Sequence, residues 1–142
     1  MKEFSWDDCL RNSSSFKKSS NKPRVQSLLG TAKARVTYFN SSSITEGNVN
    51  FVFEGYYSSV LELLHAFVLL NGYAVANHVC LGFYLKDVLD RNDLFTLFDS
   101  CRFNRNSLVY YGERMDFEVA KDSVLKCKKL ISELNKLLSK DI

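Results

Sequence analysis

The sequence predicts an all-α protein, an up-and-down bundle of about five helices. Apolar residues recur at three- and four-residue steps along most of the 142-residue chain, as they do on one face of a helix, and no segment alternates with period two. One proline and six glycines leave room for long uninterrupted helices and are too few for a turn-rich β-sandwich. The length predicts a single domain over residues 1–142, with a core at about 20–140 and a less defined N-terminal segment at 1–19.

The first predicted helix begins near Pro23, because proline suits the first turn of a helix. Ser20 or Asn21 can cap its N-terminus. Apolar residues then recur at helical spacing from Val25 to Phe39, which predicts one amphipathic helix over this segment.

A polar loop with the sequence NSSSITEGN follows at 40–48, and Asn48 can cap the next helix. That helix runs from about 49 to 71 and ends at the sequence NGY. It is apolar on most of its circumference, so we expect it to lie at the centre of the bundle.

Three more helices are predicted in the second half of the chain. A short one covers about 75–89, and a longer one covers about 91–111, where Gly112 stops it. The last covers about 117–139, with Asp116 as its cap. One face of this last helix carries an apolar stripe, and the other face is rich in lysine.

Charge is distributed unevenly along the chain, although the formal net charge is only +3. Residues 1–35 carry eight Lys or Arg and three Asp or Glu, residues 36–100 carry two and seven, and residues 101–142 carry nine and six. The two basic ends are suited to bind phosphate. They are equally suited to attract the acidic middle of the chain or to form a solvated surface.

The four cysteines are widely spaced and form no C-x-x-C pair. This spacing excludes a zinc knuckle and gives no sign of a disulfide framework. Cys80 and Cys101 have apolar neighbours, and we interpret them as small core residues.

The N-terminal sequence, MKEFSWDDCL, is charged and shows no signal peptide. The longest apolar run, around LLHAFVLLNGYAV, is too short to span a bilayer. We therefore expect a soluble, cytoplasmic protein that does not insert into a membrane.

Few residues offer the chemistry of a metal centre or of nucleophilic catalysis. Glu62 and His65 have the E-x-x-H spacing used in di-iron bundles, but such bundles need the motif twice, and His78 has no Glu three residues before it. We interpret His65 as a core histidine and expect no metal. The six glycines are isolated and form no phosphate loop, and the chain has no G-x-S-x-G. No cofactor is expected.

The stretch CRFNRNSLVYYGERMDF, at 101–117, is the main candidate for a functional site. At about 100° per residue, Arg105 falls on the apolar seam of its helix, and Arg102, Asn106 and Tyr110 form a polar row along one flank. A guanidinium on an apolar seam needs a carboxylate or an anion as partner. Guanidinium groups bind phosphate in bidentate fashion, and tyrosine rings can stack on bases.

A structural role for the same residues is the alternative. Arg105 would then pair with a buried acid of the central helix, such as Glu54 or Glu62. Tyr110 and Tyr111 are 100° apart on a helix, so we expect one of them to lie in the core and the other to be exposed.

The sequence RNSLVYYG, together with the preceding helical segment YYSSVLELLHAFVLLNGYAVANHVCLGFYL, resembles the HEPN superfamily of nucleotide-binding domains in higher eukaryotes and prokaryotes, above all its uncharacterised archaeal members. The resemblance covers about residues 20–140. It implies a bundle of four or five helices and a homodimer with a polar cleft between its subunits. Many members of the superfamily cut RNA, and others partner minimal nucleotidyltransferases in toxin–antitoxin pairs.

In this resemblance, Arg105 matches the family's motif arginine, and Asn106 matches the polar residue that follows it. Four to six residues separate the motif histidine from the arginine, and the first position that this spacing allows here is Tyr110. A tyrosine with an ordinary pKa near 10 cannot move protons at neutral pH as histidine can. Gly112 occupies the place of the tyrosine that toxin members modify.

We therefore expect binding of a nucleotide or RNA, with Arg105 as the main anion ligand, supported by Asn106, Arg102 and Tyr110, and without efficient RNase activity. One alternative is a metal-independent, toxin-like RNase in which Tyr110 replaces the histidine. Another is an interaction module, the partner of a minimal nucleotidyltransferase, whose contact surface would be the lysine-rich face of the last helix. That face comprises Lys121, Lys128, Lys129 and Lys136.

Overall fold

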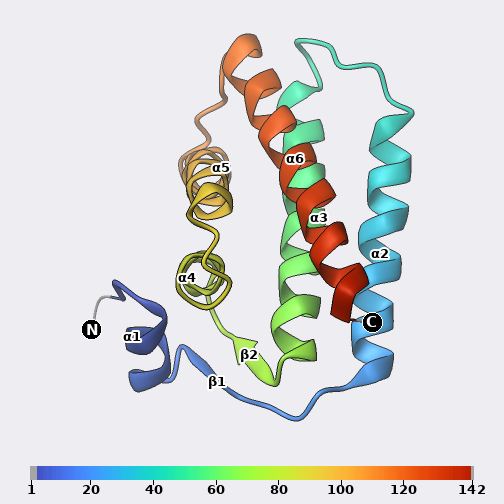
Figure 1. The fold of residues 1–142 in the computed structure, drawn as a ribbon. Helices are drawn as coiled ribbons and strands as arrows, with labels where there is room; N and C mark the ends of the chain where they lie inside the picture. The colour runs from blue at the N-terminus through green and yellow to red at the C-terminus, as the bar shows by residue number, and fades with distance from the viewer. Residues whose placement is uncertain (1–2, 142) are drawn as a thin grey trace.

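The computed structural model describes residues 3–141 as a helical bundle with one small sheet (Figure 1). The all-α fold class is therefore confirmed. In chain order the elements are α1 (Trp6–Arg11), β1 (Ser15–Lys17), α2 (Lys22–Asn40), α3 (Val49–Leu70), β2 (Tyr73–Val75), α4 (His78–Phe83), the π-helical turn η1 (Tyr84–Val88), α5 (Asn92–Tyr111) and α6 (Phe117–Asp141).

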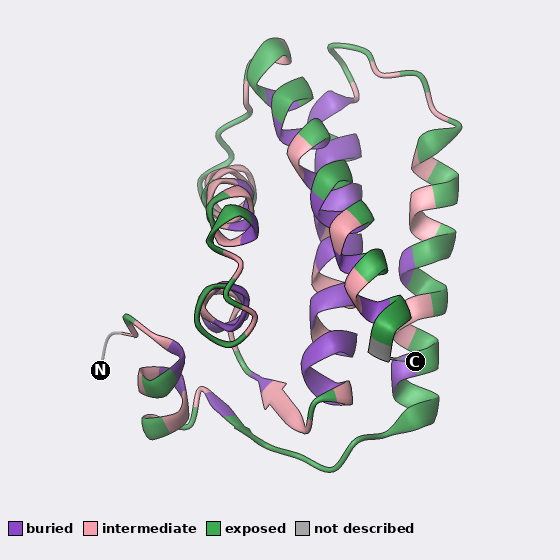
Figure 2. Ribbon diagram, in the orientation of Figure 1, coloured by how far each residue is buried: buried purple, intermediate pink, exposed green. Residues whose placement is uncertain are grey.

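Helix α3 forms the centre of the bundle, as its sequence predicts. Figure 2 shows that α3 is buried along most of its length, whereas the other long helices bury one side only. Helices α2 and α6 pack along it, and α5 packs against α6 and against α4. Aromatic side chains make up much of the core, where Tyr57 stacks on Phe98 with ring centroids 5.9 Å apart.

The long helices begin and end close to the predicted positions, and several of the predicted signals act as expected. Asn21 caps α2 by accepting a hydrogen bond from the N–H of Arg24, and Asp116 accepts one from the N–H of Val119 at the start of α6. Gly112 ends α5 with a φ of 65°, a left-handed conformation that favours glycine.

The predicted cap of α3 is wrong in its chemistry, although Asn48 does precede the helix. The Asn48 side-chain oxygen accepts a hydrogen bond from the N–H of Thr45, and its amide donates to the carbonyl of Ser43. The side chain thus closes the preceding loop instead of capping the helix.

The N-terminal segment contains two elements that the sequence does not predict, α1 and β1. Strand β1 pairs antiparallel with β2, so that Phe16 lies opposite Ala74. Each strand has only three residues, which is too short for period-two alternation to be detected. The pairing places α1 beside α4, which is far from it in the sequence.

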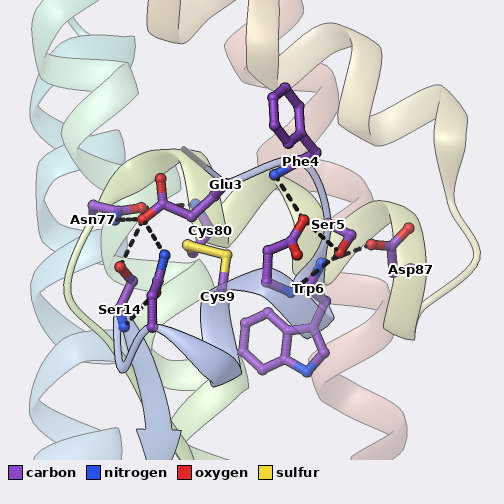
Figure 3. Close-up of a disulfide and its surroundings, with 11 residues drawn as sticks. Glu3, Phe4, Ser5, Trp6, Cys9, Ser14, Asn77, Cys80 and Asp87 are labelled. Carbon is purple, nitrogen blue, oxygen red and sulfur yellow. Dashed lines mark hydrogen bonds between the residues drawn. A yellow bond between two sulfur atoms is a disulfide. The ribbon is translucent and has the colours of Figure 1, made fainter. Parts of the chain in front are cut away.

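A disulfide bond joins Cys9 of α1 to Cys80 of α4 (Figure 3). The expectation that the cysteines form no disulfide is therefore wrong, and Cys80 is buried as half of a cystine rather than as a free core thiol. The two residues are 71 positions apart, and sequence spacing carries no signal for a pair brought together by the fold. The prediction for Cys101 is confirmed, since this free thiol is buried, with its Sγ 3.8 Å from the Sγ of Cys127.

The short helix predicted at 75–89 begins later than expected. Strand β2 occupies its first residue, and α4 begins at His78, where the Asn77 side chain accepts a hydrogen bond from the N–H of Cys80. The helix then widens into the π-helical turn η1. Within residues 3–141, no helix is both long enough and apolar enough to cross a membrane.

Candidate anion-binding site

A pocket of about 300 Å³ lies between the start of α4 and the middle of α5. Residues 76–79 line one side, and Arg102, Asn106 and Tyr110 line the other. These three residues are four positions apart, so they follow one another along a single face of α5. No carboxylate is among the lining residues.

Arg102 is held in place by a carboxylate one turn away on the same helix. Its Nε and Nη2 donate to Oδ1 of Asp99 at 3.1 and 2.8 Å. Asp99 is half exposed, whereas the Arg102 side chain is mostly covered. A guanidinium has five N–H donors, so this pair leaves donors of Arg102 for a ligand, although Asp99 offsets part of its charge.

Arg105 does not pair with either of the acids proposed for it in a structural role. Glu62 instead accepts two hydrogen bonds, each 3.1 Å long, from Arg35 of α2. Within residues 3–141 no carboxylate forms an ion pair with Arg105. Its guanidinium lies over the ring of Tyr110, 5.7 Å from the centroid, and the side chain is half-buried.

The expectation that one of the two adjacent tyrosines lies in the core is wrong. Tyr110 is 68% exposed and Tyr111 is 75% exposed. Both belong to the last turn of α5, where Ser107 and Leu108 are half-buried and Val109 is exposed, so this end of the helix is only lightly covered. Both phenol rings are therefore exposed, and that of Tyr110 lines the pocket.

His78 is the residue of this pocket that the sequence does not reveal. The motif histidine of HEPN domains lies shortly after the arginine, whereas His78 precedes Arg105 by 27 residues and comes from α4. The structure brings the imidazole to the row of Arg102 and Asn106. No local sequence signal points to this approach, because it depends on how α4 packs on α5.

A buried phenol supports the His78 imidazole from the inner side. The hydroxyl of Tyr57, on α3, lies 3.2 Å from Nδ1 of His78. Burial raises the pKa of Tyr57 well above its usual range, so the phenol stays protonated. Burial is the main cause that lowers the pKa of His78 to about 4, and the positive charges of Arg105, His65 and Arg102 contribute to the same shift in that order.

The N-terminal segment fixes the position of the start of α4 (Figure 3). The Asn77 amide donates to a carboxylate oxygen of Glu3 at 3.4 Å, and Ser14 donates to the same oxygen at 2.7 Å. The disulfide holds Cys80 three residues further on. Asn77 and Cys80, which lie on either side of His78 in the sequence, are therefore both bonded to the N-terminal segment.

The other histidine lies at a different place in the fold. His65 is half-buried on α3, and burial lowers its pKa, with a smaller contribution from the charge of Arg24. Across the described part of the chain no group of three or more His, Cys, Asp or Glu side chains is placed to hold a metal ion.

The pocket therefore combines a guanidinium, an amide and an imidazole with an exposed aromatic ring. Such a set can donate hydrogen bonds to an anion while a planar group stacks at the rim. Comparison of the chain with family models, with curated proteins and with solved structures gives no match.

Proposed function

We propose that the protein binds the phosphate of a nucleotide or of single-stranded RNA in the pocket between α4 and α5. The observation that supports this most is the convergence of Arg102, Asn106 and His78 on a pocket whose lining contains no carboxylate. A half-buried guanidinium that lines a pocket without carboxylates favours an anionic ligand, even though Asp99, outside the lining, offsets part of the charge of Arg102. The resemblance to HEPN domains points to the same class of ligand.

The side chains of this site would contribute charge, hydrogen-bond donors and a stacking surface. Arg102 lines the pocket, and Arg105, which is not among the lining residues but lies over the ring of Tyr110, adds a second positive charge without a carboxylate partner. Asn106 supplies further donors. The Tyr110 ring, which is largely exposed and backed by a guanidinium, is suited to stack on a base.

The imidazole makes binding depend on pH. If the Tyr57 hydroxyl donates to Nδ1, the proton of the neutral ring is on Nε2, which then donates to the ligand. A bound phosphate also favours the imidazolium form, so the pKa of His78 rises in the complex from about 4. Since binding then takes up a proton, affinity increases as the pH falls from 7 towards 5.

Titration with a short RNA that carries a 5′-hydroxyl tests the proposal, because its phosphodiesters keep the same charge between pH 5 and pH 7. Binding is measured at low salt by fluorescence anisotropy. We expect Arg102→Ala and Arg105→Ala each to weaken binding about tenfold and to reduce the slope of log affinity against log salt by about 1. His78→Gln should flatten the pH dependence.

Arg24→Ala is the matched control, since Arg24 lies at the start of α2 and lines a different pocket. Its affinity for RNA should fall by the small amount expected of a distant surface charge. Equal losses in the Arg24, Arg102 and Arg105 variants would contradict a localised site. Unchanged affinity in both the Arg102 and the Arg105 variants would reject the assignment.

Metal-independent RNA cleavage is a second candidate, and the position of His78 favours it. A general base could take the proton of a ribose 2′-hydroxyl, whose oxygen then attacks the adjacent phosphorus. The bond from phosphorus to the 5′-oxygen breaks, and the leaving oxygen takes a proton from solvent water. The arginines would stabilise the phosphorane. A histidine with a pKa of about 4 is, however, a weak base at neutral pH, so binding is the better supported of the two functions.

Incubation with RNA in EDTA separates cleavage from binding. Wild type is compared with His78→Gln, Tyr110→Phe and Arg105→Ala, each purified in the same way. Cleavage that is lost in the His78 variant but retained in Tyr110→Phe would assign the base to α4. Cleavage that is equal in all four proteins would identify a contaminating nuclease.

The disulfide allows the proposed cytoplasmic location to be tested, because most cytosols keep thiols reduced. Two of the four cysteines are joined in the structure, so the protein isolated under thiol-trapping conditions from its own cells should show two free thiols. Four free thiols would mean that the disulfide is not formed in that compartment.

The structure adds little support for the interaction-module alternative, in which the lysine-rich face of α6 is the contact surface. Lys121 and Lys136 pair with acids of α6, and Lys128 lies over the ring of Tyr56.

A further inference from the structure

A second and larger pocket lies on the other side of the bundle, in the groove between α2 and α6. Both helices pack on α3, and α6 crosses α3 obliquely so that its C-terminal end approaches α2 (Figure 1). The groove has a volume of about 430 Å³. That volume lies in the range of sites for small molecules, roughly 300–1,000 Å³.

The floor of this groove is apolar. It is formed by Leu29, Ala32 and Val36 of α2, Leu63 of α3, and Ile131 and Leu138 of α6. The three α2 residues are three and four positions apart, so they form a continuous strip about 10 Å long on one helix face. An apolar strip of this length is suited to an extended hydrocarbon chain.

The rim of the groove is polar and carries one charge. Lys33 and Thr37 border it on α2, and Asn135 and Ser139 border it on α6. Thr37 and Ser139 already donate their hydroxyl protons to carbonyls of their own helices. The Lys33 ammonium and the Asn135 amide are therefore the donors left for a ligand.

The charge around the groove favours an anion. No carboxylate is among the lining residues, and Glu62, next to Leu63, is neutralised by its two hydrogen bonds to Arg35. None of the ion pairs within residues 3–141 involves Lys33. A single unpaired cation at the edge of an apolar strip complements a molecule with a hydrocarbon body and one anionic end.

We propose that the α2–α6 groove binds a single-chain amphiphile with a carboxylate head, the chain lying on the strip from Leu29 to Val36 and the carboxylate at Lys33. This site is independent of the pocket between α4 and α5, from which it is separated by the central helix α3. The two assignments can therefore fail separately.

Isothermal titration of the full chain with decanoate, below its micellar concentration, tests this proposal. Decanol serves as the uncharged ligand of similar length. We expect decanoate to bind more tightly than decanol, and Lys33→Met to weaken decanoate about two- to fivefold while leaving decanol unchanged. Lys129→Met, which removes an exposed lysine of α6 outside the groove, should leave both ligands unchanged.

Val36→Trp fills the groove and should abolish binding of both ligands. Its circular dichroism and its affinity for RNA report whether the variant folds, and Lys33→Met, at an exposed position, tests the site without touching the floor. Failure of wild type to bind decanoate would overturn the proposal, as would binding that Val36→Trp leaves intact. A dimer that Val36→Trp dissociates would overturn it too, since a second copy would then occupy the groove.

Discussion

At the scale of single residues, the pocket between α4 and α5 depends on one unusual histidine. His78 is held between the buried phenol of Tyr57 and the positive charges of Arg102 and Arg105. Its surroundings disfavour the imidazolium form unless an anion is added. The imidazole of the free protein is therefore neutral near pH 7, and under the proposed function a bound anion would favour its charged form.

NMR titration of the two histidines checks this description. We expect His78 in the free protein to titrate at a pH of about 4, well below the ordinary value near 6.5. Arg105→Gln should raise the pKa of His78, because it removes the largest charge that opposes protonation. Burial, the main cause, is unaffected, so the pKa should remain below the ordinary value.

Arg24→Gln is the control for this measurement, because Arg24 lowers the pKa of His65 rather than that of His78.

The lowered pKa of His78 also affects the stability of the fold. A histidine whose pKa is lower in the folded than in the unfolded state stabilises the fold fully above about pH 6.5, and this contribution is lost as the pH falls towards 4. His78→Gln should therefore unfold with a smaller pH dependence between pH 6.5 and pH 4, and an unchanged pH dependence would contradict the lowered pKa.

At the scale of elements, the contact between α2 and α3 depends on a glycine. A Cβ atom at Gly55 of α3 would overlap the ring of Phe39 on α2, so the two helices can approach this closely only without a side chain there. Gly30, in α2, has open space around it and serves as the comparison.

Replacing each glycine by alanine should therefore change stability in opposite directions. We expect Gly55→Ala to lower the free energy of unfolding by about 1–3 kcal/mol, because Phe39 must move. Gly30→Ala should raise it by about 0.5–1 kcal/mol through helix propensity. Urea denaturation measures both, and a loss in the Gly30 variant as large as that in the Gly55 variant would contradict the packing argument.

The helices themselves could be predicted from the sequence because their signals are local. The cap at Asn21, the stop at Gly112 and the apolar periodicity of α3 each depend on residues within a turn or two. The polar row of α5 could be predicted for the same reason. The contact of His78 with that row and the disulfide between Cys9 and Cys80 could not be predicted, because both depend on packing between distant segments.

At the scale of the whole molecule, the disulfide links the N-terminal segment to the bundle across 71 positions. Closing a loop of this length restricts the unfolded chain and should stabilise the fold by about 4 kcal/mol. Reduction should lower the urea midpoint of wild type. The same reductant should have no further effect on Cys9→Ser, and an unchanged midpoint in wild type would contradict a stabilising role.

Exposed aromatic residues of α5 bear on the oligomeric state of the protein. Phe103, Tyr110 and Tyr111 of this helix are each at least 66% exposed, and Tyr110 lines the pocket. The resemblance to HEPN domains leads us to expect a homodimer that covers these side chains. Sedimentation velocity should then show a dimer that Phe103→Asp converts to a monomer, whereas Tyr38→Asp, at an equally exposed position of α2, should not. A wild-type monomer at high concentration would reject the dimer.

The cystine also divides the chain into an enclosed part and a free part. Helices α2 and α3 lie within the covalent ring closed by Cys9 and Cys80, whereas α5 and α6 lie outside it. A protease cut in the exposed loop at 41–47 would leave two pieces that migrate as one on a gel until reductant is added. A cut between α5 and α6, at 112–116, would release the last helix whether or not the cystine is intact. Limited proteolysis can thus map the connectivity of the molecule without any knowledge of its ligand.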